Sequence, residues 1–150
     1  MKKTIIFLLT LVIFSSCGYA PIYSNKNYSF NLTKITTLKD DRLNSKIKKK
    51  LQNFSNKDSQ KFVTLEINSQ KLISVIAKDS KGDPSRYEMT VKVILNINSN
   101  NNKNSKKDFK QKFNYKTNSN KFELKQYEKE IEELLINKII EELIRHLSKI

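Results

Sequence analysis

The sequence has few of the residues on which several common kinds of site depend. Its 150 residues include one cysteine, one histidine, two glycines and no tryptophan. One cysteine excludes a disulfide framework within the chain and a zinc site built from several thiolates. Two glycines are too few for a glycine-rich phosphate-binding loop. The folded domain must therefore be stabilised by the packing of an apolar core.

Residues suited to catalysis are equally scarce. His146, the only histidine, lies among helix-forming residues near the C-terminus, where a side chain at a helix end is commoner than a catalytic base. The glutamates between Glu128 and Glu142 have lysine neighbours, which is typical of a solvated helix surface. We therefore expect a protein that is not an enzyme and that has no metal site and no cofactor.

The excess of positive charge predicts an anionic partner. There are 29 Lys and Arg residues against 15 Asp and Glu residues, which gives a formal net charge of +14 at pH 7. Such a charge favours attraction to nucleic acid or to an anionic membrane component. The alternative is a general enrichment in Lys, Asn and Ile, as AT-rich coding produces, which would imply no specific ligand.

The N-terminal residues have the pattern of an export signal. Lys2 and Lys3 precede an apolar run from Ile5 to Phe14 that only Thr10 interrupts. Ten helical residues span about 15 Å, roughly half of a bilayer core, so the run fits a signal peptide better than a membrane-spanning helix. We expect residues 1–16 to be removed during export. Without Lys2 and Lys3, 27 basic residues stand against 15 acidic ones, a net charge of +12.

Cys17 follows two small residues, Ser15 and Ser16, at the place where a bacterial lipoprotein is cut and lipidated. We expect lipidated Cys17 to open a tether over residues 17–27 and a single domain to occupy residues 28–150. The alternative is a signal peptide cut elsewhere and a cysteine buried as a small apolar residue. An exported lipoprotein meets phosphorylated lipids far more often than nucleic acid, so the expected anionic partner is a membrane component.

The first half of the domain predicts a strand, a helix and a second strand. Residues 28–38 have the β-prone alternation of a strand. Apolar residues then recur at helical spacing, at Leu43, Ile47, Leu51 and Phe54. Asp40 and Asp41 precede this stripe and are suited to cap a helix. Residues 61–77 alternate as a long strand, with a change of phase near residues 70–73 that suggests a bulge or the end of an element.

The second half predicts two more strands and a long helix. Residues 86–98 alternate clearly, and residues 109–115 alternate again after an Asn-rich loop over residues 99–105. Residues 120–150 have helical periodicity, and the rotated apolar face of the first half suggests a bend or a second contact surface. The element order β-α-β-β-β-α predicts an α+β fold. We expect a four-stranded, mostly antiparallel sheet with both helices packed on one face, which leaves the other face to water or to a partner.

A group of lysines around the fourth strand is the candidate binding site. These are Lys103, Lys106 and Lys107, in or beside the loop before the strand, and Lys110 and Lys112, which continue along one of its faces. Ammonium groups in such a row can hold the phosphates of an anionic glycolipid by charge-assisted hydrogen bonds. The alternative is a charged strand edge that blocks unwanted pairing.

Four short motifs, taken in order, resemble a known family. Residues 17–23 read Cys-Gly-Tyr-Ala-Pro-Ile-Tyr and are similar to the start of the LPS-assembly lipoproteins of the LptE family. Asp41-Arg42-Leu43 resembles the start of that family's first helix. Pro84-Ser85-Arg86-Tyr87-Glu88-Met89 resembles the beginning of its third strand. Phe113-Asn114-Tyr115 resembles its Tyr-Asn strand end before the closing helix.

The resemblance implies a function for the whole chain. Members of this family are lipoproteins that sit as a plug inside the outer-membrane β-barrel LptD and support delivery of lipopolysaccharide to the outer leaflet. We therefore expect a lipid-anchored protein on the periplasmic side of the outer membrane, in a one-to-one complex with LptD, that binds lipopolysaccharide and no nucleic acid. A generic envelope lipoprotein that binds peptidoglycan or another anionic component is the first alternative. A cytosolic nucleic-acid-binding module with an uncleaved N-terminus is the second.

Overall fold

The computed structural model describes residues 28–100 and 104–150. The elements follow the order β1 (Asn31–Thr37), α2 (Arg42–Gln52), β2 (Phe62–Lys78), β3 (Pro84–Ser99), β4 (Asn104–Lys116) and α3 (Lys121–Lys149). The predicted order β-α-β-β-β-α is confirmed. The predicted signal peptide over residues 1–16, the tether over residues 17–27 with Cys17, and Lys103 lie outside the described residues.

The four strands form one sheet in the order β1-β2-β3-β4. β2 pairs antiparallel with β3, and β3 pairs antiparallel with β4. β1 pairs parallel with β2, because the connection through α2 carries the chain back to the end of the sheet where β1 began. The sheet is therefore mixed and mostly antiparallel, as the sequence predicts.

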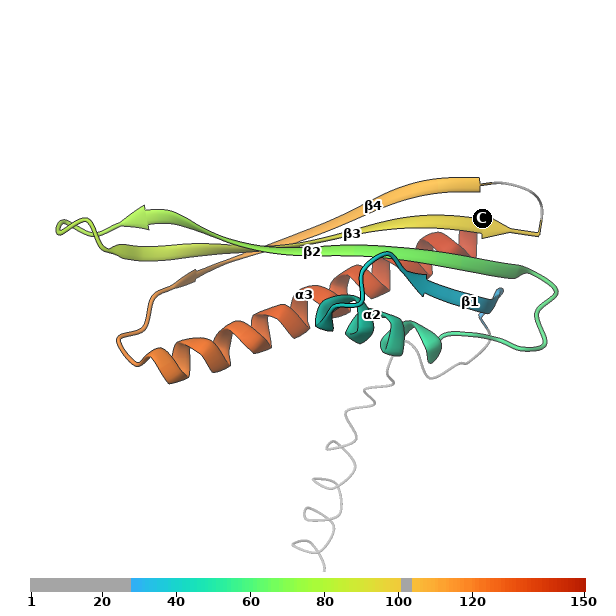
Figure 1. Ribbon diagram of the computed structural model, residues 1–150, viewed down its shortest axis with the longest axis horizontal. Helices are drawn as coiled ribbons and strands as arrows, with labels where there is room; N and C mark the ends of the chain where they lie inside the picture. The colour runs from blue at the N-terminus through green and yellow to red at the C-terminus, as the bar shows by residue number, and fades with distance from the viewer. Residues whose placement is uncertain (1–27, 101–103) are drawn as a thin grey trace, which may run out of the picture.

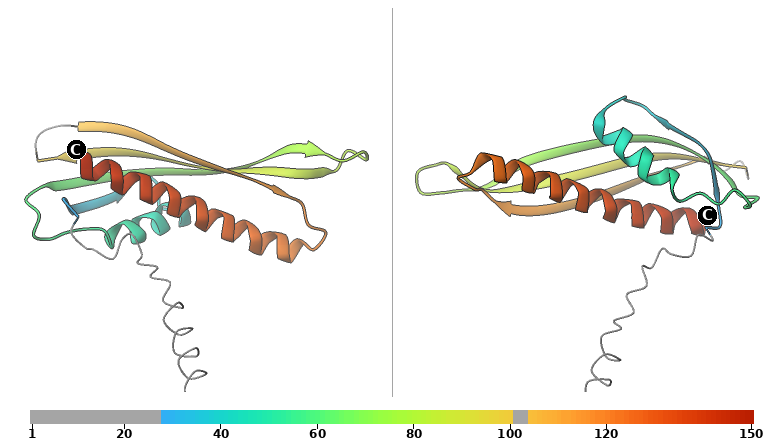
Figure 2. Two further views of the ribbon diagram at one scale, coloured as in Figure 1. Left: turned by 180° about the vertical axis from the view of Figure 1, so that it is seen from behind. Right: turned by 90° about the horizontal axis from the view of Figure 1, so that it is seen from below.

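Both helices lie on the same face of the sheet (Figures 1 and 2). The core between the two layers is made of alternate residues of the strands and of one side of each helix. From β3 it takes Met89, Val91, Val93, Leu95 and Ile97. From α3 it takes Leu135, Ile136, Ile139, Leu143 and Leu147. We call the opposite side of the sheet, which no helix of the described residues covers, the open face.

α2 is fixed to β2 at its N-terminus. Asp41 caps the helix by accepting a hydrogen bond of 2.8 Å from the backbone N–H of Asn44, as predicted. Asn44 is fully buried, and its Oδ1 accepts hydrogen bonds from the backbone N–H of Ser69 at 2.9 Å and from its Oγ at 2.8 Å. The side chain of Asn44 thus takes the place that a further residue of β1 would occupy beside β2.

α3 contacts the sheet through only part of its length. Its C-terminal half packs on the sheet, whereas its N-terminal half diverges from it (Figures 1 and 2). Consistent with this divergence, Tyr127 and Leu134 are more than two-fifths exposed, while Leu143 is fully buried. Of the rotated apolar face that the sequence predicts, Ile131 and Leu135 are buried in the core while Tyr127 and Leu134 are exposed, and a bend or a second contact surface stays a prediction.

β2 is much longer than the strand beside it. β1 reaches only from Phe62 to Ile67 of β2, although β2 continues to Lys78. The predicted bulge or element end near residues 70–73 is wrong, because β2 continues to Lys78 and its register with β3 is regular there and is broken only around Val75, Ala77 and Lys78. The change of phase in the sequence reflects the end of the helix layer: beyond Ser69 the side chains on the helix side are no longer buried.

Candidate functional site

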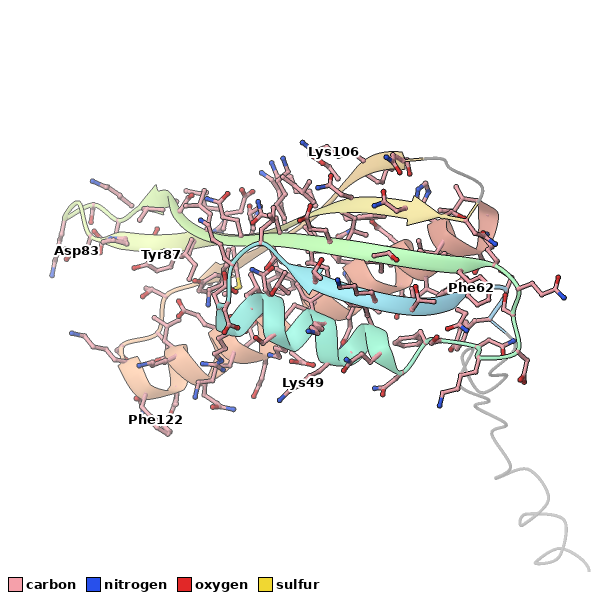
Figure 3. All side chains as sticks on the ribbon, turned by 45° about the vertical axis from the view of Figure 1, so that its right-hand side comes forward. Lys49, Phe62, Asp83, Tyr87, Lys106 and Phe122 are labelled. Carbon is pink, nitrogen blue, oxygen red and sulfur yellow. The ribbon has the colours of Figure 1, made fainter. Side chains whose placement is uncertain are left out.

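The predicted lysines separate onto two faces of β4. Lys106, Lys110 and Lys112 are paired in register with Asn96, Lys92 and Thr90 of β3, whose side chains lie on the open face. We call these three lysines the basic row. Lys107 is opposite the buried Leu95 and therefore lies on the helix side. Figure 3 shows Lys106 on the side of the sheet away from Lys49 and Phe122 of the helices.

Two carboxylates on the open face are held by lysines. Lys92 Nζ lies 2.8 Å from Asp108 Oδ2, and this hydrogen bond is the main reason why the pKa of Asp108 is below its ordinary value. Lys112 Nζ donates a 2.6 Å hydrogen bond to Glu88 Oε1, which likewise lowers the pKa of Glu88. All four groups are near solvent, so each pair stabilises the fold only slightly.

Positive charge remains in excess after these pairs are formed. Lys106 and Lys110 flank Asp108, yet within residues 28–100 and 104–150 neither has a carboxylate within ion-pair distance. Lys110 also faces Lys92 directly across the two strands, and because Lys92 is paired with Asp108, the unpaired positive charge at this point is that of Lys110. Alternate residues of a strand are about 7 Å apart, so the basic row can contact several anionic groups of one extended ligand.

The alternative explanation of the lysines also receives support. β4 is the last strand of the sheet, so its outer edge has no partner strand among the described residues. Charged side chains on such an edge hinder pairing with another chain. The two roles are compatible, because the same ammonium groups that oppose strand pairing remain accessible to phosphates.

Lys107 belongs to a different cluster. It lines a shallow hollow with residues of β4 and of the end of α3: Phe109, Glu142, Arg145, His146 and Lys149. Burial, followed by the charges of Lys107 and Lys149, lowers the pKa of His146. The His146 ring packs edge-on against Phe109, with ring centroids 6.0 Å apart. His146 is therefore a packing residue near the helix end, and Lys107 is not part of the open face.

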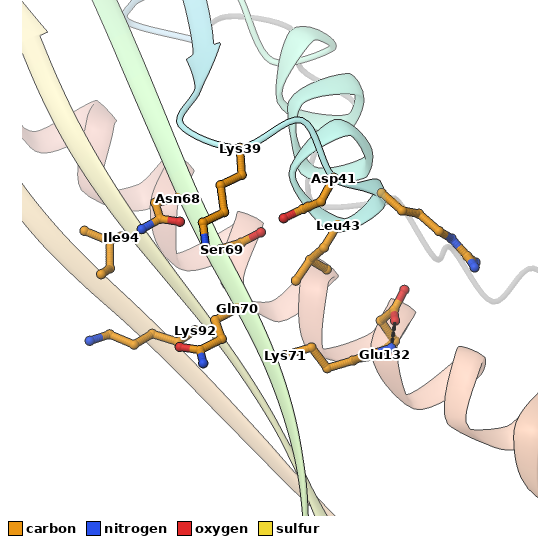
Figure 4. Close-up of a pocket in the computed structure, with 11 residues that line it drawn as sticks. Lys39, Asp41, Leu43, Asn68, Ser69, Gln70, Lys71, Lys92, Ile94 and Glu132 are labelled. Atoms are coloured by element: carbon orange, nitrogen blue, oxygen red, sulfur yellow. Dashed lines mark hydrogen bonds and ion pairs between the residues drawn. The ribbon is translucent and has the colours of Figure 1, made fainter.

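A cleft that the sequence did not indicate lies where β1 ends (Figure 4). Its volume is about 550 Å³, and it runs around the edge of β2 from the open face to the helix side. The cations that line it are Lys39, Arg42, Lys71 and Lys92. Lys71 is bound to Glu132 at 2.6 Å and Lys92 to Asp108, which leaves Lys39 and Arg42 without an ion pair in the part of the chain that the structure describes. Asp41, Arg42 and Leu43, which form one of the family-like motifs of the sequence, also line this cleft, although the motif by itself did not indicate one.

The last two motifs of the family resemblance, residues 84–89 and 113–115, meet in the structure. Tyr87 of β3 and Tyr115 of β4 are directly opposite in register, and their rings stack with centroids 5.5 Å apart. Tyr115 Oη donates a 2.7 Å hydrogen bond to Glu128 of α3. Burial, followed by this hydrogen bond, raises the pKa of Tyr115. The pair connects the third strand, the fourth strand and the closing helix.

The described residues hold neither a group of metal ligands nor a membrane-spanning helix. Residues 28–100 and 104–150 contain no group of three or more His, Cys, Asp and Glu side chains placed to hold a metal ion. Over the same residues, neither helix has both the length and the apolar character needed to span a membrane.

Comparison with known proteins relates the chain to others by fold. No family model matches the sequence, and no curated protein is significantly similar to it. Among solved structures, rare lipoprotein B from Shewanella oneidensis is similar with a TM-score of 0.57 at 14% identity, over 80% of this chain and 94% of that one. Lipoprotein B from Nitrosomonas europaea gives a TM-score of 0.59 at 10% identity, over 81% and 86%. A minor lipoprotein from Acinetobacter baumannii gives 0.57 at 12% identity, over 81% and 92%. The chain thus has a fold found in bacterial lipoproteins.

Proposed function

We propose that this chain is a non-enzymatic outer-membrane lipoprotein that docks as a plug in the LptD β-barrel and supports lipopolysaccharide assembly. The observation that carries the proposal is the conjunction of a fold found in bacterial lipoproteins with Cys17 placed directly after a signal-like apolar run. The LptE-like motifs at residues 17–23, 84–89 and 113–115 narrow the proposal to one family. In this role Cys17 holds the domain at the membrane on its periplasmic side, and no nucleic acid is bound.

The docking part of the proposal is tested by purification from the producing bacterium. Membranes are solubilised in mild detergent, and the chain is isolated through a C-terminal tag. We expect a one-to-one complex with a large outer-membrane barrel. Recovery of the chain alone would refute docking and would favour a generic envelope lipoprotein that binds peptidoglycan or another anionic component. Mass spectrometry of the N-terminus should find a diacylglyceryl group on Cys17, and an unmodified N-terminus would contradict the anchor.

The lipopolysaccharide part is assigned to the basic row. Lys106, Lys110 and Lys112 are on the open face, where the helices leave the sheet uncovered, and Lys92 faces Lys110. Lys107 is no longer a contact in this proposal, because it lies on the helix side. Phosphate groups that approach the open face would form charge-assisted hydrogen bonds with Lys106 and Lys110, which have no carboxylate partner among the described residues.

A charge-matched pair of variants tests this assignment. One variant carries Lys106→Glu, Lys110→Glu and Lys112→Glu, and its control carries Lys49→Glu, Lys125→Glu and Lys129→Glu on the exposed surfaces of the helices. Both lose the same net charge. We expect the first to weaken binding to lipopolysaccharide by about tenfold or more and the second to have a much smaller effect. Equal losses would mean that only net charge matters, and no loss in either would leave the basic row with its edge-protecting role alone.

A further inference from the structure

One edge of β2 has no partner strand in the part of the chain that the structure describes. β1 pairs with β2 only from Phe62 to Ile67, and the strand beyond Ile67 continues as far as Lys78. In the right-hand view of Figure 2 no other element is drawn along this edge of β2 beyond the end of α2. Beyond Ile67, β2 therefore has a partner strand on one side only, that of β3.

Hydrogen bonds identify which backbone groups face this edge. The backbone O of Ile67 accepts a hydrogen bond of 3.0 Å from Leu38 N, and the backbone N of Ser69 donates one to Asn44 Oδ1. The O of Phe62 instead accepts from Asn100 N, on the opposite side of the strand. Backbone direction alternates along a strand, so the odd-numbered residues face the uncovered side. Lys71, Ile73 and Val75 are the next three, and we call them the free edge.

The segment around the free edge is apolar on both of its faces. Leu72 is 55% exposed, Ile73 38%, Val75 46% and Ile76 46%. Such a segment has the β-branched composition that favours strand pairing. An exposed apolar edge strand of this kind promotes association with other chains unless something protects it.

The opposite edge of the same sheet, formed by β4, differs from the free edge because its charged residues oppose pairing with another strand. β4 carries charged side chains along its length, at Lys106, Lys107, Asp108, Lys110 and Lys112. Between Lys71 and Lys78, by comparison, β2 has neither a charged residue nor a proline. Natural sheets use charges and proline to keep edge strands from pairing. The sequence therefore opposes strand pairing at β4 and permits it at the free edge.

We propose that the free edge binds an extended segment of another polypeptide, which adds to the sheet as a strand next to β2. Each of its three residues offers one N–H and one C=O, and the exposed apolar side chains offer contacts to alternate side chains of the ligand. Lys39 and Arg42, which have no ion pair among the described residues, lie at one end of this edge. The other end, at the turn between β2 and β3, carries Lys78 and Lys81 together with Asp79 and Asp83 and so has no net charge. The matching ligand is thus a strand of apolar residues with a carboxylate beside Lys39 and Arg42. A second copy of this chain is a poor match, because both chains carry a high net positive charge. The inference does not depend on the proposed function.

Amide hydrogen exchange of the full-length chain in mild detergent provides the test. The probe is a seven-residue peptide in which valine alternates with glutamate. Its two counterparts carry lysine in place of glutamate, or N-methyl groups on alternate residues that remove the donors facing β2. We expect the valine–glutamate peptide to slow exchange at the amides of Lys71, Ile73 and Val75, with binding about tenfold weaker for the lysine peptide. The N-methylated peptide should give no protection.

Variants place the binding on the free edge. Ile73→Lys and Val75→Lys should each abolish protection, because a charge on an edge strand opposes pairing. Leu134→Lys, a change at a comparably exposed apolar residue of α3, should not. Three results would overturn the proposal. These are no protection at millimolar peptide, equal protection by the N-methylated peptide, or protection without any peptide in a concentration-dependent dimer, which would make a second copy the occupant.

Discussion

Asn44 is the single polar residue on which the junction between α2 and β2 depends. Its side chain accepts from Ser69 and donates to the backbone O of Lys39 at 3.0 Å and to Asp41 Oδ2 at 3.1 Å. It therefore supplies hydrogen-bond partners to backbone groups that neither β1 nor α2 pairs, namely the N–H of Ser69 and the carbonyl of Lys39. The sequence pattern did not reveal this role, because burial in a helix is predicted from the spacing of apolar residues and asparagine is polar.

Replacing Asn44 should be costly. Asn44→Ala leaves the Ser69 N–H and hydroxyl and the Lys39 carbonyl without their partner, so we expect the free energy of unfolding to fall by about 2–4 kcal/mol. Urea denaturation followed by circular dichroism measures the loss. Asn98→Ala, at an exposed position of β3, is the control and should stay within about 0.5 kcal/mol of the parent. A loss for Asn44→Ala no larger than that of the control would contradict the structural role.

Glu132 should make stability depend on acidity. It is 7% exposed, and although burial raises its pKa, the hydrogen bond and charge of Lys71, together with Lys46, outweigh burial and hold the pKa below 4.5. A carboxylate with a lowered folded-state pKa stabilises the fold above the unfolded-state value of about 4.5, and this stabilisation is lost as the pH falls through the folded-state pKa.

The test compares Glu132→Gln with the parent over a series of pH values. Urea midpoints measured from neutral pH to well below 4.5 should fall for both proteins, and the fall should be smaller for Glu132→Gln, because the variant has no proton to take up at this site. Glu130→Gln, an exposed change on the same helix, should follow the parent. Parallel curves for the parent and Glu132→Gln would show that the ion pair does not stabilise the fold.

At the scale of elements, α3 consists of two functionally different halves. Its C-terminal half supplies a large part of the core, whereas its N-terminal half stands away from the sheet. Asn120 caps the separated end by accepting hydrogen bonds from Phe122 N and Glu123 N. The first turns therefore depend on this cap and on continuity with the rest of the helix, whereas Ile131 and Leu135, further along the same half, are buried in the core.

The two halves should respond differently to the same truncation. Leu143→Ala removes a fully buried side chain and should lower the free energy of unfolding by about 2–5 kcal/mol. Leu134→Ala, at a position 41% exposed, should cost less than about 1 kcal/mol. Thermal and urea unfolding of both variants measure the difference. Similar losses would mean that the N-terminal half of the helix packs on the sheet more closely than the structure indicates.

The elements were predictable where one physical signal dominates. Period-two alternation identified residues 86–98, and helical periodicity identified the closing helix, because each of these faces a single apolar layer. The placement of β1 beside β2 and parallel to it is set by the crossover, which alternation within a strand does not encode. Of the candidate site, the sequence identified the lysines of β4. It did not separate Lys107 from the basic row, because only the register with β3 decides which face each lysine occupies.

The cleft and the free edge were not predictable for a related reason. Both arise from the difference in length between β1 and β2, a property of two strands taken together. The apolar residues from Leu72 to Ile76 look like core residues in the sequence, and only the absence of a neighbouring element in the described structure makes them surface.

At the scale of the whole molecule, the two faces of the sheet differ, and so do its two edges. The helices and the core cover one face, and the open face carries the basic row. The β4 edge carries lysines, whereas the free edge of β2 is mostly apolar. The large net positive charge acts on every one of these surfaces. A charge of this sign favours the approach of anions and at the same time destabilises the compact state through repulsion between like charges.

Salt should therefore have opposite effects on binding and on folding. Raising the ionic strength from about 0.01 M to about 0.1 M shortens the Debye length from about 30 Å to about 10 Å, which screens both attraction to lipopolysaccharide and repulsion within the domain. We expect affinity for lipopolysaccharide to fall and the free energy of unfolding to rise over this range. Both slopes should be smaller in the Lys106→Glu, Lys110→Glu, Lys112→Glu variant, which carries six fewer units of positive charge. Titration calorimetry and urea unfolding at several salt concentrations measure the two quantities. Stability that falls with salt would mean that the ion pairs of Lys71 and Lys46 with Glu132 outweigh the repulsion between unpaired lysines.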